Sequence, residues 1–142
     1  MAYTAVATIM LKAPIEKVWE AVTKPELVKQ YFFGTDLVTD WQVGLPIFFR
    51  GEWEGKAYED KGTVLSFDAP KSLSYNYWSS MSGKLDQPEF YQVLRYDLEL
   101  VGDETKLSIT QENAASQEEA DHSAQNWQMV LDGLKKIVEK PI

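Results

Sequence analysis

The chain has 142 residues, a formal net charge of −8 at pH 7 and no cysteine. Its length suits one domain, residues 1–142, that buries its own core. The lack of cysteine excludes disulfides, thiolate catalysis and Cys-based metal sites, and the acidity argues against nucleic acid, whose phosphates need basic partners. The apolar stretch Ala5–Leu11 has no basic flank and is too short to span a bilayer. We therefore predict a cytoplasmic protein without membrane insertion.

The N-terminal third predicts one strand followed by two short helices. Residues Tyr3–Lys12 alternate as a strand does. Pro14 suits the first position of a helix, and apolar residues at helical spacing follow it: Ile15, Val18, Trp19 and Val22. Pro25 ends that helix and begins a second one, which Gly34 ends and whose apolar face holds Leu27, Val28, Tyr31 and Phe32.

From Asp36 to Gln111 the pattern changes to period two, which predicts an antiparallel meander. Short turns separate the expected strands, which are Thr35–Trp41, Leu45–Trp53, Ala57–Phe67, Leu73–Trp78, Tyr91–Val101 and Thr105–Gln111. One connection, Ser79–Phe90, is longer and polar. Loops of that length in a compact domain are usually lids or mobile segments, so we expect a lid here.

The segment Ser116–Lys140 predicts a long amphipathic helix. Ser116 and Glu119 have the spacing of a capping box. One stripe is apolar and tapers from small to large side chains: Ala120, Ala124, Trp127, Leu131, Leu134 and Val138. The two alanines lie either tight against the sheet or over the open end of a cavity. Because an antiparallel sheet must cover its apolar face, strands followed by this helix predict an α+β fold.

The segment Ala13–Phe32, APIEKVWEAVTKPELVKQYF, resembles the N-terminal signature of START-like, helix-grip domains of the Aha1-like (activator of Hsp90 ATPase homologue) group. The chain departs from the commonest pattern at Lys24, where an Asp often caps the second helix, and at Tyr31, where Trp is frequent. Later segments agree with the same group in the same order: Trp41-x-x-Gly44, Gly62-Thr63-Val64-Leu65, Thr105-Lys106-Leu107 and Trp127-x-x-Val130-Leu131-x-x-Leu134-Lys135.

This resemblance implies the helix-grip (START-like, Bet v 1-like) fold, in which a curved sheet of about six or seven strands wraps around a long C-terminal helix. It also implies a cavity between sheet and helix, where members of the wider superfamily bind apolar or amphipathic small molecules. Some members, such as polyketide cyclases, act on these molecules as enzymes. The eukaryotic namesake carries a second domain, and the two together stimulate a chaperone ATPase. This chain has no room for that second domain, so a chaperone partner is not supported.

Strand parity predicts which side chains face the helix. The expected inward sets are Leu65 and Phe67, then Leu73, Tyr75 and Tyr77, then Leu94, Tyr96, Leu98 and Leu100, and finally Leu107 and Ile109. The tyrosine hydroxyls either reach water at the rim or orient a ligand. Our candidates for lining a cavity are Phe67, Tyr75, Tyr77, Leu94, Tyr96, Leu98, Ile109, Ala120, Ala124, Trp127 and Leu131.

The sequence offers little for catalysis. His122, the only histidine, falls on the polar face of the last helix. Glu52 and Glu54 share a strand face with Arg50 and could form a carboxylate pair, although a solvent-facing charged stripe explains them more simply. Gly51–Gly55 lacks the spacing and lysine of a phosphate loop. We therefore predict no catalytic residue, no metal and no cofactor.

The hypothesis that these patterns favour is a binding protein for an apolar or amphipathic small molecule, held between sheet and helix. An interior with no room would count against it. Two alternatives stay open. One is a cyclase- or dehydratase-type enzyme, which requires an inward-pointing ionisable group and would be supported by a buried Asp or Glu with a raised pKa beside the tyrosines. The other is a chaperone-activating interaction module. A homodimer is also considered.

Overall fold

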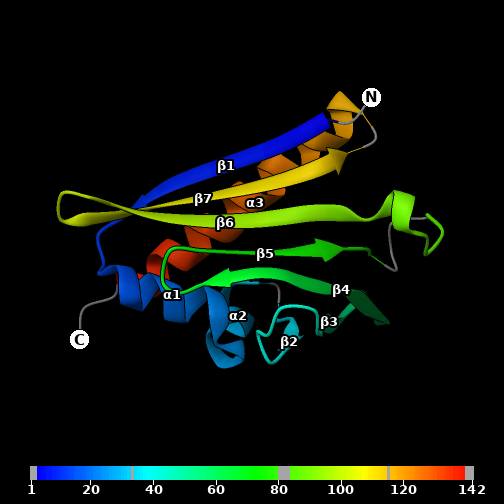
Figure 1. Ribbon diagram of the computed structural model, residues 1–142, viewed down its shortest axis with the longest axis horizontal. Helices are drawn as coiled ribbons and strands as arrows, with labels where there is room; N and C mark the ends of the chain where they lie inside the picture. The colour runs from blue at the N-terminus through cyan, green and yellow to red at the C-terminus, as the bar shows by residue number, and fades with distance from the viewer. Residues whose placement is uncertain (1–2, 33, 80–83, 115, 140–142) are drawn as a thin grey trace.

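The computed structural model describes residues 3–32, 34–79, 84–114 and 116–139. Figure 1 shows one curved sheet with the long helix α3 across its concave face. All neighbouring strands are antiparallel, in the order β1-β7-β6-β5-β4-β3-β2. The elements are β1 (Tyr3–Leu11), α1 (Ile15–Thr23), α2 (Pro25–Tyr31), β2 (Asp36–Val38), β3 (Pro46–Trp53), β4 (Lys56–Asp68), β5 (Ser72–Tyr77), a 3₁₀ turn (Pro88–Phe90), β6 (Gln92–Val101), β7 (Glu104–Ala114) and α3 (Gln117–Val138).

This architecture confirms the predicted α+β helix-grip fold. Most boundaries fall within a residue or two of their predicted positions. The clearest exception is β2, which ends at Val38 instead of Trp41. Trp41 has a φ of 52°, outside the extended region that a strand requires. Residues 80–83 of the predicted lid Ser79–Phe90 lie outside the described residues, and Pro88–Phe90 forms the 3₁₀ turn.

The C-terminal half of α3 covers the sheet with large aliphatic side chains. Leu131, Leu134 and Val138 are fully buried in the main core. Ala120 packs separately with Ala5 of β1 and Ala114 of β7. The alanines of α3 therefore lie tight against the edge of the sheet, which resolves the alternative left open by the sequence.

The predicted capping box at the start of α3 is half formed. The Ser116 hydroxyl accepts a hydrogen bond from the Glu119 backbone N–H at 3.1 Å. The Glu119 carboxylate instead accepts hydrogen bonds from Lys84 and Gln92. The serine therefore caps the helix, while the glutamate joins the helix to the rest of the domain.

Two parity predictions on the sheet are wrong. The pairing of β4 with β5 shifts between Val64 and Ser66, as at a β-bulge. Because an irregularity of this kind breaks the strict alternation of faces, Val64 and Phe67 both face the core and Leu65 is 43% exposed. Leu100, predicted to face inward, is 62% exposed because it lies near the β6–β7 turn. Figure 1 shows that turn extending beyond the helices.

Gly62 of β4 lies close to the backbone of Asn76 in β5. A Cβ atom added at this position would lie only 1.7 Å from the Asn76 carbonyl oxygen of β5. The Asn76 side chain also accepts a hydrogen bond from the Thr63 N–H at 2.6 Å. Glycine is therefore required here by space and not by backbone angle.

We predict that Gly62→Ala lowers the free energy of unfolding by about 3 kcal/mol, because β4 and β5 must separate to admit the methyl group. The matched control is Gly102→Ala. A Cβ at this position would meet nothing within 4 Å. The expected loss in the free energy of unfolding, about 1 kcal/mol, comes only from its positive φ of 63°. Urea unfolding of both variants measures the difference, and equal losses would contradict the steric explanation.

Candidate functional site

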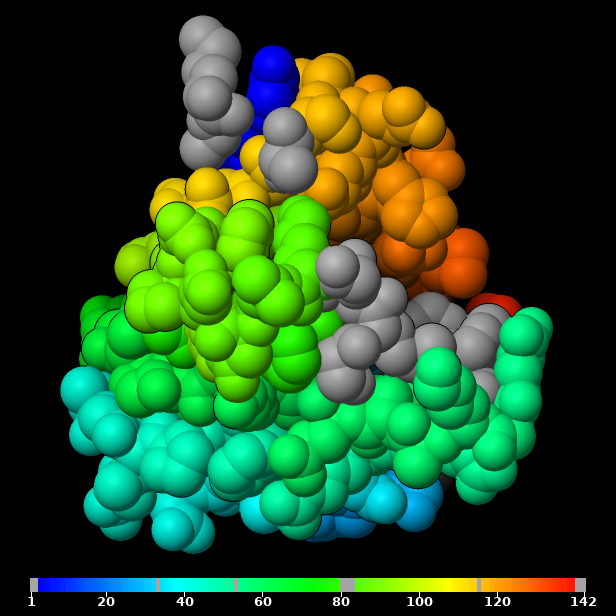
Figure 2. Space-filling model, turned by 90° about the vertical axis from the view of Figure 1, so that its right-hand side faces the viewer, coloured from blue at the N-terminus to red at the C-terminus, as the bar shows by residue number. Residues whose placement is uncertain are grey.

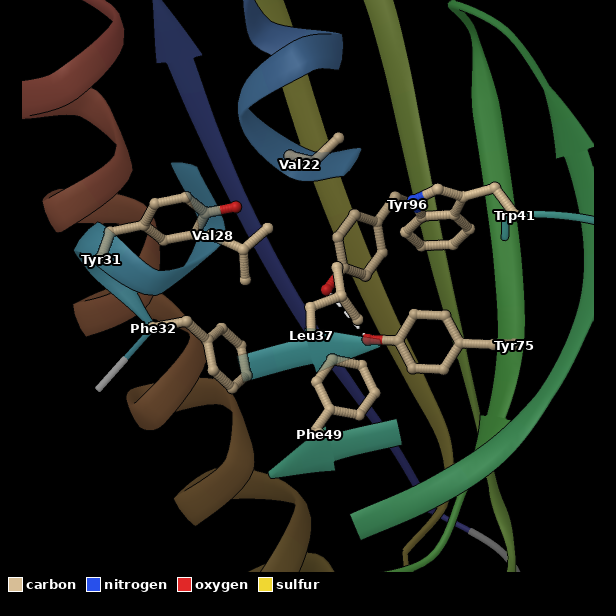
Figure 3. A pocket seen from close by; sticks show the side chains of 9 residues that line it. All are labelled: Val22, Val28, Tyr31, Phe32, Leu37, Trp41, Phe49, Tyr75 and Tyr96. Atoms are coloured by element: carbon tan, nitrogen blue, oxygen red, sulfur yellow. Dashed lines mark hydrogen bonds between the residues drawn. The ribbon is translucent and has the colours of Figure 1, made fainter. Parts of the chain in front are cut away.

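A small void lies between α2 and the concave face of the sheet (Figure 3). Its volume is about 10 Å³, which is room for about one water molecule. The surrounding side chains are all aliphatic or aromatic: Val22, Val28, Tyr31, Phe32, Leu37, Trp41, Phe49, Tyr75 and Tyr96. The interior is thus packed nearly solid, and a larger molecule fits only if side chains move.

A connected group of aromatic rings forms most of the wall of this void. Trp41 stacks on Phe67 with ring centroids 5.5 Å apart, and Phe49 lies 5.4 Å from Tyr75. Tyr96 meets Trp127 of α3 edge to face at 5.9 Å. Such pairs add about 0.5–1.5 kcal/mol each beyond the burial of their area. The aromatic group therefore ties the sheet to α3.

Two tyrosine hydroxyls point toward one another at the void. Tyr75 of β5 and Tyr96 of β6 are 2% and 7% exposed, and their hydroxyl oxygens are 3.0 Å apart. Burial raises the pKa of both phenols above the ordinary value of 10.0. Both side chains are therefore neutral hydrogen-bonding groups at physiological pH.

Two hydrogen bonds tie the α2 side of the void to α1. α2 has seven residues, of which only Val28 is fully buried. The Tyr31 hydroxyl donates to the Ala21 carbonyl of α1 at 2.6 Å, and the Trp41 indole N–H donates to the Thr23 carbonyl at 2.8 Å. A helix this short is not stable alone. The helix therefore depends on these contacts with the rest of the domain for its stability.

A chain of polar contacts runs outward from Trp127, which packs against the wall residue Tyr96. The Trp127 indole N–H donates to Gln111 at 2.7 Å, Gln111 donates to Gln92, and Gln92 donates to Glu119 at 3.2 Å. Lys84 closes the chain with an ion pair to Glu119 at 3.0 Å. Figure 2 shows this end of the molecule, with the start of α3 in orange and residues near 84–91 in yellow-green.

The predicted cavity residues are distributed over three environments. Tyr75 and Tyr96 line the void, and Phe67 and Trp127 contact its aromatic wall. A second set lies in the surrounding core: Leu94, Leu98, Ile109 and Leu131. Ala120 and Ala124 belong to the separate alanine cluster. Tyr77 also packs on the core, and its hydroxyl donates to Asp60 at 2.6 Å.

Sequence reasoning missed the residues that complete the wall from the N-terminal third: Val22, Val28, Tyr31, Phe32, Leu37, Trp41 and Phe49. The apolar faces of the two predicted helices already contained Val22, Val28, Tyr31 and Phe32. Continued alternation through Leu45–Trp53 would have added Phe49. Trp41 follows a strand end at positive φ, where no periodic pattern places a side chain.

A buried carboxylate, Asp60 of β4, was also missed. It is 8% exposed and accepts the hydrogen bond from Tyr77, but it is not among the residues that line the void. The other acid–base candidates face solvent: His122, Glu52 and Glu54 are exposed. Arg50 pairs with Glu59 at 2.6 Å across β3 and β4.

Among the described residues, no cluster of three or more acidic or histidine side chains is placed to hold a metal ion. In the same part of the chain, no helix has the length and hydropathy to cross a membrane.

Comparison with known proteins identifies the relatives of this chain. The family model described as Activator of Hsp90 ATPase homolog 1-like protein matches residues 12–139. The solution structure of ChR145 from Cytophaga hutchinsonii is 44% identical over 96% of this chain and 94% of its own, with a TM-score of 0.84. No curated protein matches.

Two more distant structures share the fold alone. The crystal structure of MLL2253 from Mesorhizobium loti is 21% identical, with a TM-score of 0.79 over 99% of each chain. The solution structure of the Aha1 dimer from Colwellia psychrerythraea is 20% identical, with a TM-score of 0.75 over 97% of each chain.

We predict that the protein unfolds cooperatively as the pH rises above 10. The pKa of Tyr75 and of Tyr96 is raised in the folded state, so the folded chain holds protons that the unfolded chain releases above pH 10. The stability contributed by burying these neutral phenols is complete below pH 10 and is lost above it. Tyrosinate absorbance and circular dichroism should change together, and Tyr75→Phe/Tyr96→Phe should move the midpoint to higher pH. Stepwise ionisation with retained structure would contradict this.

Proposed function

This chain belongs to the family of activator of Hsp90 ATPase homologue 1-like proteins, and on that premise we propose that it is a binding protein for a small apolar or amphipathic molecule. The proposed site is the space between α2, α3 and the concave face of the sheet. The observation that supports it most directly is the void itself, whose wall is entirely aliphatic and aromatic apart from tyrosine hydroxyls. Small-molecule sites are typically apolar cavities with a few polar groups.

The volume of the void means that binding requires the interior to open. Space for about one water molecule is far less than an aromatic ring needs. The side that gives way, in this proposal, is α2, a helix of seven residues of which only Val28 is fully buried. The sheet side is fixed by its continuous pairing from β3 to β7.

The composition of the wall favours binding over catalysis. Acid–base catalysis requires a group that exchanges protons near neutral pH. The tyrosines of the wall do not exchange protons near neutral pH, because burial raises their pKa. Asp60 would be a candidate acid or base, but it does not line the void. Phe49, its partner on the neighbouring strand β3, lines the void instead. We therefore propose a ligand that is held without being changed.

The first test needs no mutation. Titration with ethylbenzene, an uncharged aromatic hydrocarbon, should shift the indole N–H resonance of Trp41 in a saturable manner, because this ring forms part of the wall. The indole of Trp78, which donates to the Lys84 carbonyl outside the void, should not shift. Uniform small shifts of both indoles, or no saturation, would count against an interior site.

A matched pair of variants then locates the site. Leu37→Phe adds volume to the wall and should weaken ethylbenzene binding by about fivefold. Val38→Phe makes the same side chain at the neighbouring position, which is 43% exposed, and should leave binding unchanged. Equal effects of the two variants would place any binding elsewhere.

We also propose that the chain forms a homodimer. The Colwellia protein is described as a dimer. In this chain β1 is an edge strand, paired only with β7 among the described residues, and Val6 on it is 57% exposed. Unpaired strand edges are ready sites for association.

Native mass spectrometry of freshly purified protein should show a dimer, and it would report a co-purified small molecule in the same spectrum. A monomer at all protein concentrations would contradict the dimer while leaving the binding proposal intact.

A further inference from the structure

We propose that the ligand carries an uncharged oxygen acceptor, such as a ketone, aldehyde or ester carbonyl, and that the hydroxyl pair of Tyr75 and Tyr96 recognises this oxygen. This inference rests on the proposed function above and specifies the chemistry of the same site. Figure 3 shows the two hydroxyls meeting at the void, between rings that come from β5 and β6.

The two hydroxyls hold more hydrogens than the pair itself can use. Each phenol has one O–H group to donate. Within the pair one hydroxyl donates to the other, and either oxygen can be the donor. Within the described residues, neither hydroxyl makes a second hydrogen bond. Among the described residues, one O–H hydrogen therefore has no acceptor, in whichever direction the pair is arranged.

Leaving that hydrogen unpaired costs free energy. Both side chains are more than nine-tenths buried, and a buried donor without an acceptor is destabilising. The void beside the pair has room for about one water molecule, which could accept the hydrogen. A ligand oxygen placed there takes over that hydrogen bond, so displacing the water loses no polar contact.

The wall of the void carries no charged side chain. None of the nine wall residues is basic, so a carboxylate or phosphate would be buried without a counter-charge, which is strongly unfavourable. None of them is acidic either, so a cation would meet ring faces and no carboxylate. A neutral carbonyl matches both facts, because it accepts one hydrogen bond and needs no ion pair.

The two hydroxyls stay protonated and act as hydrogen-bond donors. Burial raises the pKa of Tyr75 and Tyr96, so neither phenol ionises near neutral pH and the pair remains a donor. A hydroxyl that donates while it accepts from a second hydroxyl is polarised by it. The pair is therefore a better donor toward a ligand than an isolated phenol would be.

The test compares two probes of nearly equal shape. Acetophenone carries a carbonyl oxygen where α-methylstyrene carries a CH₂ group. We expect the wild-type protein to bind acetophenone about three- to tenfold more tightly. Benzoate, of similar size but charged, should bind more weakly than either. In Tyr75→Phe/Tyr96→Phe the preference for acetophenone should disappear, while affinity for α-methylstyrene stays within about twofold.

Two controls make the result decisive. Tyr91→Phe removes an exposed phenol that donates to Asp86 and should keep the full preference. Infrared spectra of carbonyl-labelled acetophenone bound to the wild-type protein should show the carbonyl stretch lowered by a hydrogen bond. This measurement remains available if the double variant fails to fold.

The outcomes separate the two proposals. Equal binding of acetophenone and α-methylstyrene to the wild type, or a preference that survives in the folded double variant, overturns this inference and leaves the proposed function standing. An unshifted carbonyl stretch overturns it as well. If neither probe binds, the proposed function fails, and the acceptor specificity fails with it.

Discussion

The contact between α3 and the concave face of the sheet is the constraint on which the domain depends. A seven-stranded antiparallel sheet has one apolar face that must be covered, and Leu131, Leu134 and Val138 cover only the part beneath the second half of the helix. The rest of the concave face is covered by α1, α2 and the aromatic group. The void lies on the α2 side of this core, and its wall takes residues from α1, α2, the strands and the segment after β2.

Much of this arrangement could be predicted because it follows from local periodicity. The alternation in β5 and β6 already placed Tyr75 and Tyr96 on the same face, and the structure brings their hydroxyls together. The stripe of α3 likewise predicted the buried set from Leu131 to Val138. In these elements, burial decides the orientation of each side chain, and the period of the element reports it.

The features that could not be predicted depend on departures from periodicity or on distant partners. The shifted pairing near Leu65 reverses the face of one strand, and no residue type signals it. Trp41 reaches the wall from irregular backbone at positive φ. Glu119 had the position of a capping residue but binds Lys84 and Gln92, which lie far away in the sequence. A pattern of local spacing contains no information about such partners.

The polar chain from Trp127 to Lys84 has a mechanical consequence. Each amide in this chain donates a hydrogen bond to the next group outward. Turning the indole of Trp127 therefore breaks several hydrogen bonds instead of one. The terminal ion pair is partly exposed and contributes little alone; the stiffness comes from the two glutamines between. The α3 side of the interior is therefore rigid and the α2 side is flexible. Thermal fluctuations of the domain should be largest where α2 meets the sheet.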